Sequence, residues 1–191
     1  SSNENSVYGN VLNALDHTKV PGGSSGGSAV AVQAGLCMAS LGSDTGGSVR
    51  QPADFCGILG MKPTYGSISR HGLIAYASSF DQVGIFGNTV NDIALLLEVM
   101  SGADEFDSTT SPNPSKGGAF KELKNLSNPA ESSKKYRIAY FKEALQHPSL
   151  DKEIRETILN MVDELRSKGH TVTEIDFELL DYVVPAYYVL T

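Results

Sequence analysis

The sequence has few cysteines, and their surroundings do not suggest a metal site. Cys37 and Cys56 are the only two, with neither a CxxC spacing nor a histidine companion. Both lie among small and apolar residues. This context favours two reduced, buried thiols in a cytoplasmic protein.

Positive charge and long apolar runs are also scarce. The net charge is −7, and no basic run stands out beyond Lys134-Lys135. Because a direct grip on nucleic acid needs a positive field, we do not expect this chain to hold RNA or DNA by itself. No apolar stretch reaches the roughly 18 residues that span a bilayer, and no signal peptide is recognised, so no membrane contact is expected.

What the chain does have is an ordinary globular composition with an excess of glycine. The 191 residues are 40% hydrophobic and include 19 glycines, many of them in two short clusters. This length suffices for one domain with a core. The chain opens on Ser1 without an initiator Met and stops at Thr191 in mid-pattern, and we interpret both ends as truncations.

The first half of the chain predicts short elements between loops. We expect a buried small-residue helix over 26–39, a second short helix over 48–57 and a core strand over 58–61. Residues 63–87 alternate apolar and Gly/Ser positions without a clear period, and strands and loops are expected there. A helix is predicted from Thr89 to Met100, with Thr89 as its N-cap.

The second half predicts a βαβ unit after a polar segment. Residues 103–135 are poor in apolar side chains and are expected to form a surface excursion. Beyond them, 136–141 and 170–175 have strand patterns. An amphipathic helix is expected between them, over 151–168. Such a unit implies a parallel pair of strands with a right-handed crossover.

Two Gly/Ser clusters, 21–28 and 42–53, each lie just before a predicted helix or in its first turn. A helix N-terminus offers unpaired N–H groups, and glycine lets the backbone approach a ligand closely. Together they favour a site for a negative oxygen, either a phosphate or a tetrahedral oxyanion. A phosphate loop would need a lysine before its serine, which neither cluster has. Residues 23–27 match GxSxG, but no good strand precedes them, as a nucleophile elbow requires.

Both clusters together, with Phe55-Cys56-Gly57 and residues 60–64, strongly resemble the amidase signature family. The resemblance implies an α/β fold with a mixed central β-sheet and helices on both faces. The chain would be part of a single amidase-signature domain. Its expected segments are a Gly/Ser-rich catalytic core (1–102), the surface excursion (103–135), the βαβ unit (136–177) and a truncated continuation (178–191).

The resemblance also implies a Ser–cisSer–Lys triad. By motif, Ser48 is the nucleophile and Ser24 the bridging serine, which follows a cis peptide bond in the family. A serine hydroxyl needs a base, and a lysine serves if burial lowers its pKa. Lys19 lies too close to the first cluster to match, so we expect the lysine before residue 1 and expect the 191 residues alone to be inactive.

Further site residues follow from the same resemblance. Asp44 and Arg50 could form a supporting ion pair, although two solvated charges are an equal alternative. The remaining residues are the oxyanion N–H donors and three substrate-binding candidates: Thr45, Gly46, Gly47 and Ser48, then Gln51, Tyr187 and Tyr188. No metal is expected.

Residues 2–9, 69–84 and 107–111 resemble one branch of the family, the glutaminase subunits of tRNA-dependent amidotransferases. This implies hydrolysis of glutamine at Ser48 through a glutamyl ester, with the ammonia passed to partner amidotransferase subunits in the cytoplasm. The glutaminase itself is expected to need no cofactor. ATP and Mg²⁺ would be bound by a partner, and tRNA would be held only through that partner.

Two other functions remain open from the sequence. One is a stand-alone amidase that acts on another small carboxamide and needs no partner. The other is an inactive truncated remnant or binding domain. Retention of both serines and of the glycines around them argues against long decay.

Overall fold

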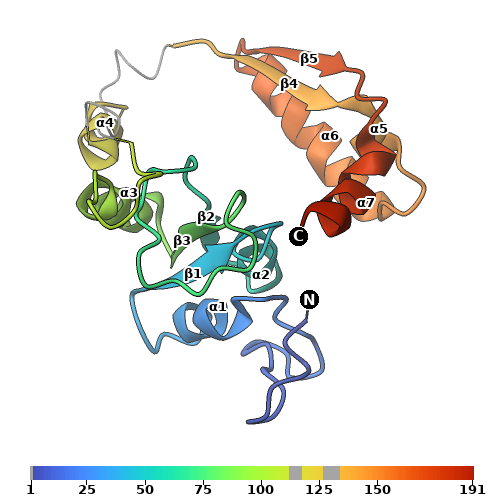
Figure 1. Ribbon diagram of the computed structural model, residues 1–191. Coiled ribbons are helices and arrows are strands. Elements are labelled where there is room, and N and C mark those ends of the chain that lie inside the picture. Colours follow the sequence, from blue (N-terminus) through green and yellow to red (C-terminus); the bar gives the residue numbers. More distant parts are fainter. Residues whose placement is uncertain (1, 112–117, 127–133) are drawn as a thin grey trace. The chain divides into compact units, whose positions relative to one another are not determined.

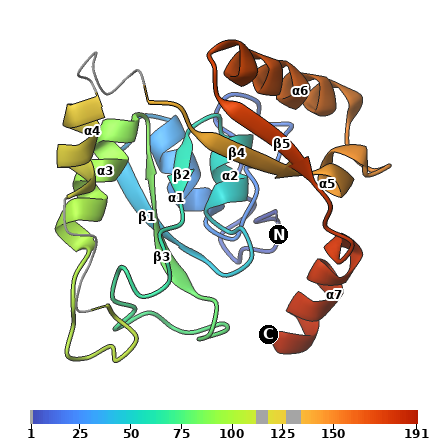
Figure 2. The same ribbon diagram turned by 90° about the horizontal axis from the view of Figure 1, so that it is seen from above.

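The computed structural model describes residues 2–111, 118–126 and 134–191 (Figures 1 and 2). The chain divides into two compact units, Ser1–Leu126 and Ser127–Thr191, with the boundary inside the predicted excursion 103–135. In the part of the chain that is described, no helix is long and apolar enough to cross a membrane.

The first unit is built on an antiparallel sheet of three strands. β1 (Ala39–Asp44) and β2 (Leu59–Met61) both pair with β3 (Gln82–Gly87), which gives the order β1-β3-β2. In this register Asp44 lies opposite Gln82. The sheet therefore places the second Gly/Ser cluster at the end of β1, beside the start of the central strand.

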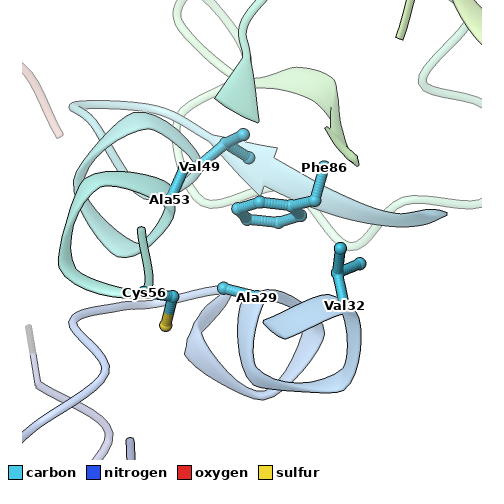
Figure 3. Packing of buried hydrophobic residues seen from close by; sticks show 6 residues of the cluster. All are labelled: Ala29, Val32, Val49, Ala53, Cys56 and Phe86. Atoms are coloured by element: carbon cyan, nitrogen blue, oxygen red, sulfur yellow. The ribbon is translucent and has the colours of Figure 1, made fainter. Parts of the chain in front are cut away.

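One face of this sheet packs against two helices, α1 (Gly26–Gln33) and α2 (Arg50–Phe55). The ring of Phe86 projects from β3 into the space between them (Figure 3). The buried cluster comprises Ala29, Val32, Val49, Ala53, Cys56 and Phe86. Burial of these side chains fixes both helices, and hence the Gly/Ser loops before them, against the sheet.

The opposite face packs against α3 (Val90–Met100). Ile85, which neighbours Phe86 but points to the other side of the strand, is buried with Ile68 and Ile93. α4 (Ala119–Leu126) lies alongside α3, and the Phe120 N–H donates to Glu98 Oε2 at 3.1 Å.

The second unit contains the predicted parallel pair. β4 (Arg137–Phe141) and β5 (Thr171–Ile175) are joined through α5 (Lys142–Gln146) and the long α6 (Lys152–Ser167). The Asp151 carboxylate caps α6 by accepting from the N–H groups of Glu153 and Ile154. α7 (Leu180–Leu190) follows β5.

Several expectations are confirmed. The class is α/β, with helices on both faces of the first sheet and with antiparallel and parallel strands in two separate sheets. Thr89 caps α3 through its hydroxyl, which accepts from the Asp92 N–H at 3.2 Å. The βαβ unit and the short helix after Ser48 are also present. Membership of all 191 residues in one domain stays a prediction.

Other expectations are wrong. The helix predicted over 26–39 ends at Gln33, because Gly35 takes a left-handed φ of +70° and turns the chain. Residues 39–44 form a strand instead. The predicted excursion 103–135 contains α4. Residues 112–117 and 127–133 of that excursion lie outside the described part of the chain. By contrast, the strands and loops expected over residues 63–87 are confirmed by β3, the central strand of the sheet.

Candidate active site

The two Gly/Ser clusters lie side by side and are tied at two points. The N–H of Ser25 donates to the carbonyl oxygen of Ser48 at 3.2 Å. The N–H of Gly23 donates to the side-chain oxygen Oε1 of Gln51 at 3.1 Å. Ser24 therefore sits between two tethers to the segment that carries Ser48. The Gly23–Ser24 peptide bond is cis, as the family resemblance implies.

Both proposed serines are accessible. Ser24 is exposed, and Ser48 is half-buried in the turn that leads into α2. Among the described residues, neither hydroxyl makes a hydrogen bond to another protein group, so no bond joins Ser24 Oγ to Ser48 Oγ. The hydroxyls are thus free to meet a substrate or a third group.

The turn before α2 is organised around the carboxylate of Asp44. This fully buried side chain accepts hydrogen bonds from the N–H groups of Gly47 at 2.9 Å, Val49 at 3.1 Å and Arg50 at 3.3 Å. Gly47 has a φ of +118°, a conformation that L side chains rarely adopt. The loop between Asp44 and Arg50 is therefore held from inside by one carboxylate.

The same carboxylate forms the ion pair with Arg50. Arg50 Nη2 lies 3.0 Å from Asp44 Oδ1, and Arg50 Nε lies 3.1 Å from Oδ2, which makes the contact bidentate. Burial alone would raise the pKa of Asp44, but the bonds from Arg50 and the backbone N–H groups outweigh it and lower that pKa. The ion-pair hypothesis is confirmed, and the alternative of two solvated charges fails for Asp44.

The predicted oxyanion donors differ in their surroundings. The Gly47 N–H already donates to Asp44 Oδ1. Within the described residues, the N–H groups of Gly46 and Ser48 have no protein acceptor, so they are available to an incoming oxygen. The assignment of Thr45, Gly46 and Gly47 as an oxyanion hole stays a prediction.

Sequence reasoning missed two polar contacts of these loops. The hydroxyl of Thr45 donates to Asp81 Oδ1 at 2.6 Å, across 36 positions of sequence. The hydroxyl of Ser25 donates to the Ser43 carbonyl oxygen and accepts from the Ser43 N–H, both at 3.1 Å. No local sequence pattern predicts either contact, because each depends on how β1 packs against neighbouring segments.

The three substrate-binding candidates are divided between the units. Gln51 is in α2, where its Oε1 is engaged by the Gly23 N–H. Tyr187 and Tyr188 lie in α7 of the second unit, with ring centroids 5.3 Å apart in an edge-on contact. Their contacts with substrate stay predictions. Among the described side chains, no three His, Cys, Asp or Glu residues gather as metal ligands would.

Comparisons with known proteins identify the family of this chain. The family model described as Amidase matches residues 1–191. The A-subunit of glutamyl-tRNA(Gln) amidotransferase from Chlorobium phaeobacteroides is 50% identical over 195 residues, covering 100% of this chain and 38% of that protein.

Solved structures give the same picture. The crystal structure of the glutamyl-tRNA(Gln) amidotransferase A-subunit from Thermotoga maritima superposes with a TM-score of 0.85 at 41% identity, covering 100% of this chain and 40% of that one. A crystal structure of an amidase superposes with a TM-score of 0.76 at 32% identity, covering 99% of this chain and 38% of that one. The chain thus spans about two fifths of the length of the relatives it matches.

Proposed function

The chain belongs to the amidase family, and from this premise we propose that it is part of a glutamine amidohydrolase that supplies ammonia for amidation of Glu-tRNA(Gln). The choice of glutamine is supported by the relative from Chlorobium phaeobacteroides, which is named as the A-subunit of glutamyl-tRNA(Gln) amidotransferase. In this proposal Ser48 is the nucleophile, Ser24 the bridging serine, and a lysine the base.

The observation that carries the proposal is the pair of tethers between the clusters. The bond from Ser25 N–H to the Ser48 carbonyl oxygen and the bond from Gly23 N–H to Gln51 bracket Ser24. A serine nucleophile needs a second group within proton-transfer reach, and two tethered loops can hold both hydroxyls at one substrate. Both hydroxyls are also free of competing protein partners among the described residues.

The chemistry follows from these positions. Ser48 Oγ attacks the side-chain carbonyl carbon of glutamine, while its proton passes through Ser24 to the lysine. The carbonyl oxygen becomes an oxyanion, which the N–H groups of Gly46 and Ser48 would stabilise. Collapse of this intermediate breaks the C–N bond, and the departing nitrogen takes up a proton and leaves as ammonia. Water then hydrolyses the glutamyl ester to glutamate and restores Ser48.

The ammonia would be consumed by partner amidotransferase subunits. A partner that binds ATP and Mg²⁺ would activate the glutamyl carboxylate on the tRNA and would also hold the tRNA. The net charge of −7 agrees with this division of labour, because a negatively charged chain repels a polyanion.

A stand-alone amidase is the second candidate, and the likeness to a solved amidase at 32% identity supports it. Such an enzyme would hydrolyse other small carboxamides and would need no partner. The choice of substrate and the effect of partner subunits separate the two candidates.

The deciding experiment is mass spectrometry of the chain extended upstream to include the lysine region. The protein is incubated with glutamine and, separately, with an electrophilic amide analogue. We expect a covalent adduct on Ser48 that is absent from Ser48→Ala, and a preference for glutamine over other amides. A preference for other amides would favour the stand-alone amidase. If neither compound gives an adduct with a well-folded protein, the remnant or binding domain is the better description.

A further inference from the structure

The carboxylate of Asp81 has no part in the proposed serine chemistry, yet it touches the nucleophile loop. Its Oδ1 accepts from the hydroxyl of Thr45 at 2.6 Å. Its Oδ2 accepts from the N–H groups of Tyr76 at 2.9 Å and Ala77 at 3.0 Å. Asp81 is only 3% exposed, so this is a buried and fully engaged carboxylate.

Asp81 contacts Thr45, whereas the loop contacts of Asp44 begin at Gly47. Asp81 directly precedes β3, where Gln82 lies opposite Asp44 of β1. Asp44 holds the C-terminal part of the loop through Gly47 and the following N–H groups. Asp81 holds its first residue, Thr45. Two buried carboxylates, Asp44 at the end of β1 and Asp81 just before β3, thus hold the loop that contains Ser48.

The segment that carries Asp81 is itself fixed. The carbonyl oxygen of Ser78 accepts from the Tyr65 hydroxyl at 2.9 Å and also from the Arg70 guanidinium. Arg70 is in turn held by Asp107, whose Oδ2 accepts the Arg70 N–H at 2.9 Å. These contacts hold the chain just before Asp81 in place.

We propose that Asp81 is a positioning residue that, through Thr45 Oγ1, fixes the N–H groups of Gly46 and Ser48 where the oxyanion forms. A preorganised donor is effective only if it does not have to move when charge develops, and Gly46 and Gly47, which follow Thr45, have no side chains that could hold the loop. This inference rests on the proposed function of Ser48.

The test uses the whole protein that contains these residues and measures amide hydrolysis. Thr45→Val removes the hydroxyl but keeps the side-chain shape, and Thr45→Ser restores a hydroxyl. We expect Thr45→Val and Asp81→Asn each to lower kcat at least about tenfold, towards the 10²–10³-fold typical of losing one oxyanion donor, with KM changed less than about threefold. Thr45→Ser should exceed Thr45→Val in kcat by at least about tenfold.

A double-mutant cycle separates positioning from a general loss of structure. Both substitutions act on the same hydrogen bond, from Thr45 Oγ1 to Asp81 Oδ1. The double variant should therefore lose little more kcat than either single variant. The matched control is Thr18→Val, since the Thr18 hydroxyl donates to Asp16 Oδ1 at the same 2.6 Å in an exposed loop. That variant should keep the kcat of the parent.

The outcomes are distinct. Unchanged kcat in Thr45→Val, losses that add in the double variant, or an equal loss in Thr18→Val would each overturn the role of Asp81. If Asp81→Asn fails to fold, Thr45→Val still decides, because it leaves the Tyr76 and Ala77 contacts intact. Full activity in Ser48→Ala would instead contradict the proposed function itself.

Discussion

The N–H of Ser25 donates to the carbonyl oxygen of Ser48 at 3.2 Å, which joins the two Gly/Ser clusters through their backbones. This bond survives replacement of either side chain, so substitutions of the serines test chemistry rather than assembly. What can break it is a change that displaces the Ser25 backbone. Gly42 of β1 is one such position, because a Cβ there would press on the side chain of Ser25.

Gly42→Ala should destabilise the first unit. A Cβ at this position would lie 2.6 Å from Ser25 Oγ, 2.7 Å from Ser25 Cβ and 2.8 Å from the ring of Phe86, so a packed core must shift. We expect a loss of about 1–3 kcal/mol in the free energy of unfolding, measured by urea denaturation. Gly27→Ala is the control, because its Cβ would meet nothing within 4 Å and alanine favours the helix. Equal losses in both variants would contradict the packing argument.

Asp44→Asn should cost more stability than Arg50→Met. Asparagine cannot accept from all three loop N–H groups and from both nitrogens of Arg50, and each hydrogen bond to a charged group typically contributes about 1.5–3 kcal/mol. Arg50→Met leaves the backbone donors of Asp44 in place, and the side chain of Arg50 is already 55% exposed. Urea denaturation of the two variants at neutral pH makes the comparison. A larger loss in Arg50→Met would show that the guanidinium, not the loop, is the main partner.

Stability should fall on acidification, with part of the loss traceable to Asp107. The Thr109 hydroxyl and the N–H groups of Arg70 and Thr109 hold the pKa of Asp107 well below its usual range. A carboxyl with a lowered folded pKa stabilises the fold above its unfolded pKa of about 3.9, and this contribution is lost as pH falls towards the folded value. As the pH is lowered from 6 to about 3, the unfolding free energy of Asp107→Asn should therefore decline less steeply than that of the unsubstituted protein. Identical slopes would refute this link.

Gln51→Ala should lower kcat rather than raise KM. Its Oε1 accepts the Gly23 N–H next to Ser24, so its loss loosens the bridging serine, and a small misplacement near the chemistry can cost up to about 10²-fold in rate. Gln51→Glu keeps an acceptor oxygen and should retain more activity than Gln51→Ala. Steady-state kinetics of the whole protein decide. A raised KM with unchanged kcat would instead assign Gln51 to substrate contact.

Cys37 should react with iodoacetamide faster than Cys56. Burial raises the pKa of the Cys56 thiol, which lies 3.6 Å from the Pro21 carbonyl oxygen, and thiolate is the reactive form. Cys37 is only half-buried. Peptide mapping of native protein should show alkylated Cys37 first, and both thiols should react once urea is added. Equal rates in the native protein would contradict the burial of Cys56.

The elements that could be predicted are those with local signals. The helix after Thr89 has a capping hydroxyl and an apolar stripe, and α6 with its flanking strands has clear periods of its own. A compound motif of fixed order singles out Ser24 and Ser48, and their catalytic roles stay predictions. In each case the decisive residues lie within a few turns of the chain or in one recognisable pattern.

The elements that were missed depend on distant partners. β1 has the sequence ASLGSD, which looks like a loop, and becomes a strand because β3, far along the chain, pairs with it. Its glycine serves close packing against Ser25 and Phe86 rather than flexibility. The contact of Thr45 with Asp81 arises at the same junction, so it too was invisible before the sheet was known.

The order β1-β3-β2 has a consequence for how the protein is made. The middle strand of the sheet is the last of the three to be synthesised, and the first two do not pair with each other. Until Gly87 has left the ribosome, β1 and β2, which lie on either side of the Ser48 loop and α2 in the sequence, lack the strand that joins them. In a nascent chain, the proposed nucleophile Ser48 is therefore synthesised before the central strand of the sheet that positions it.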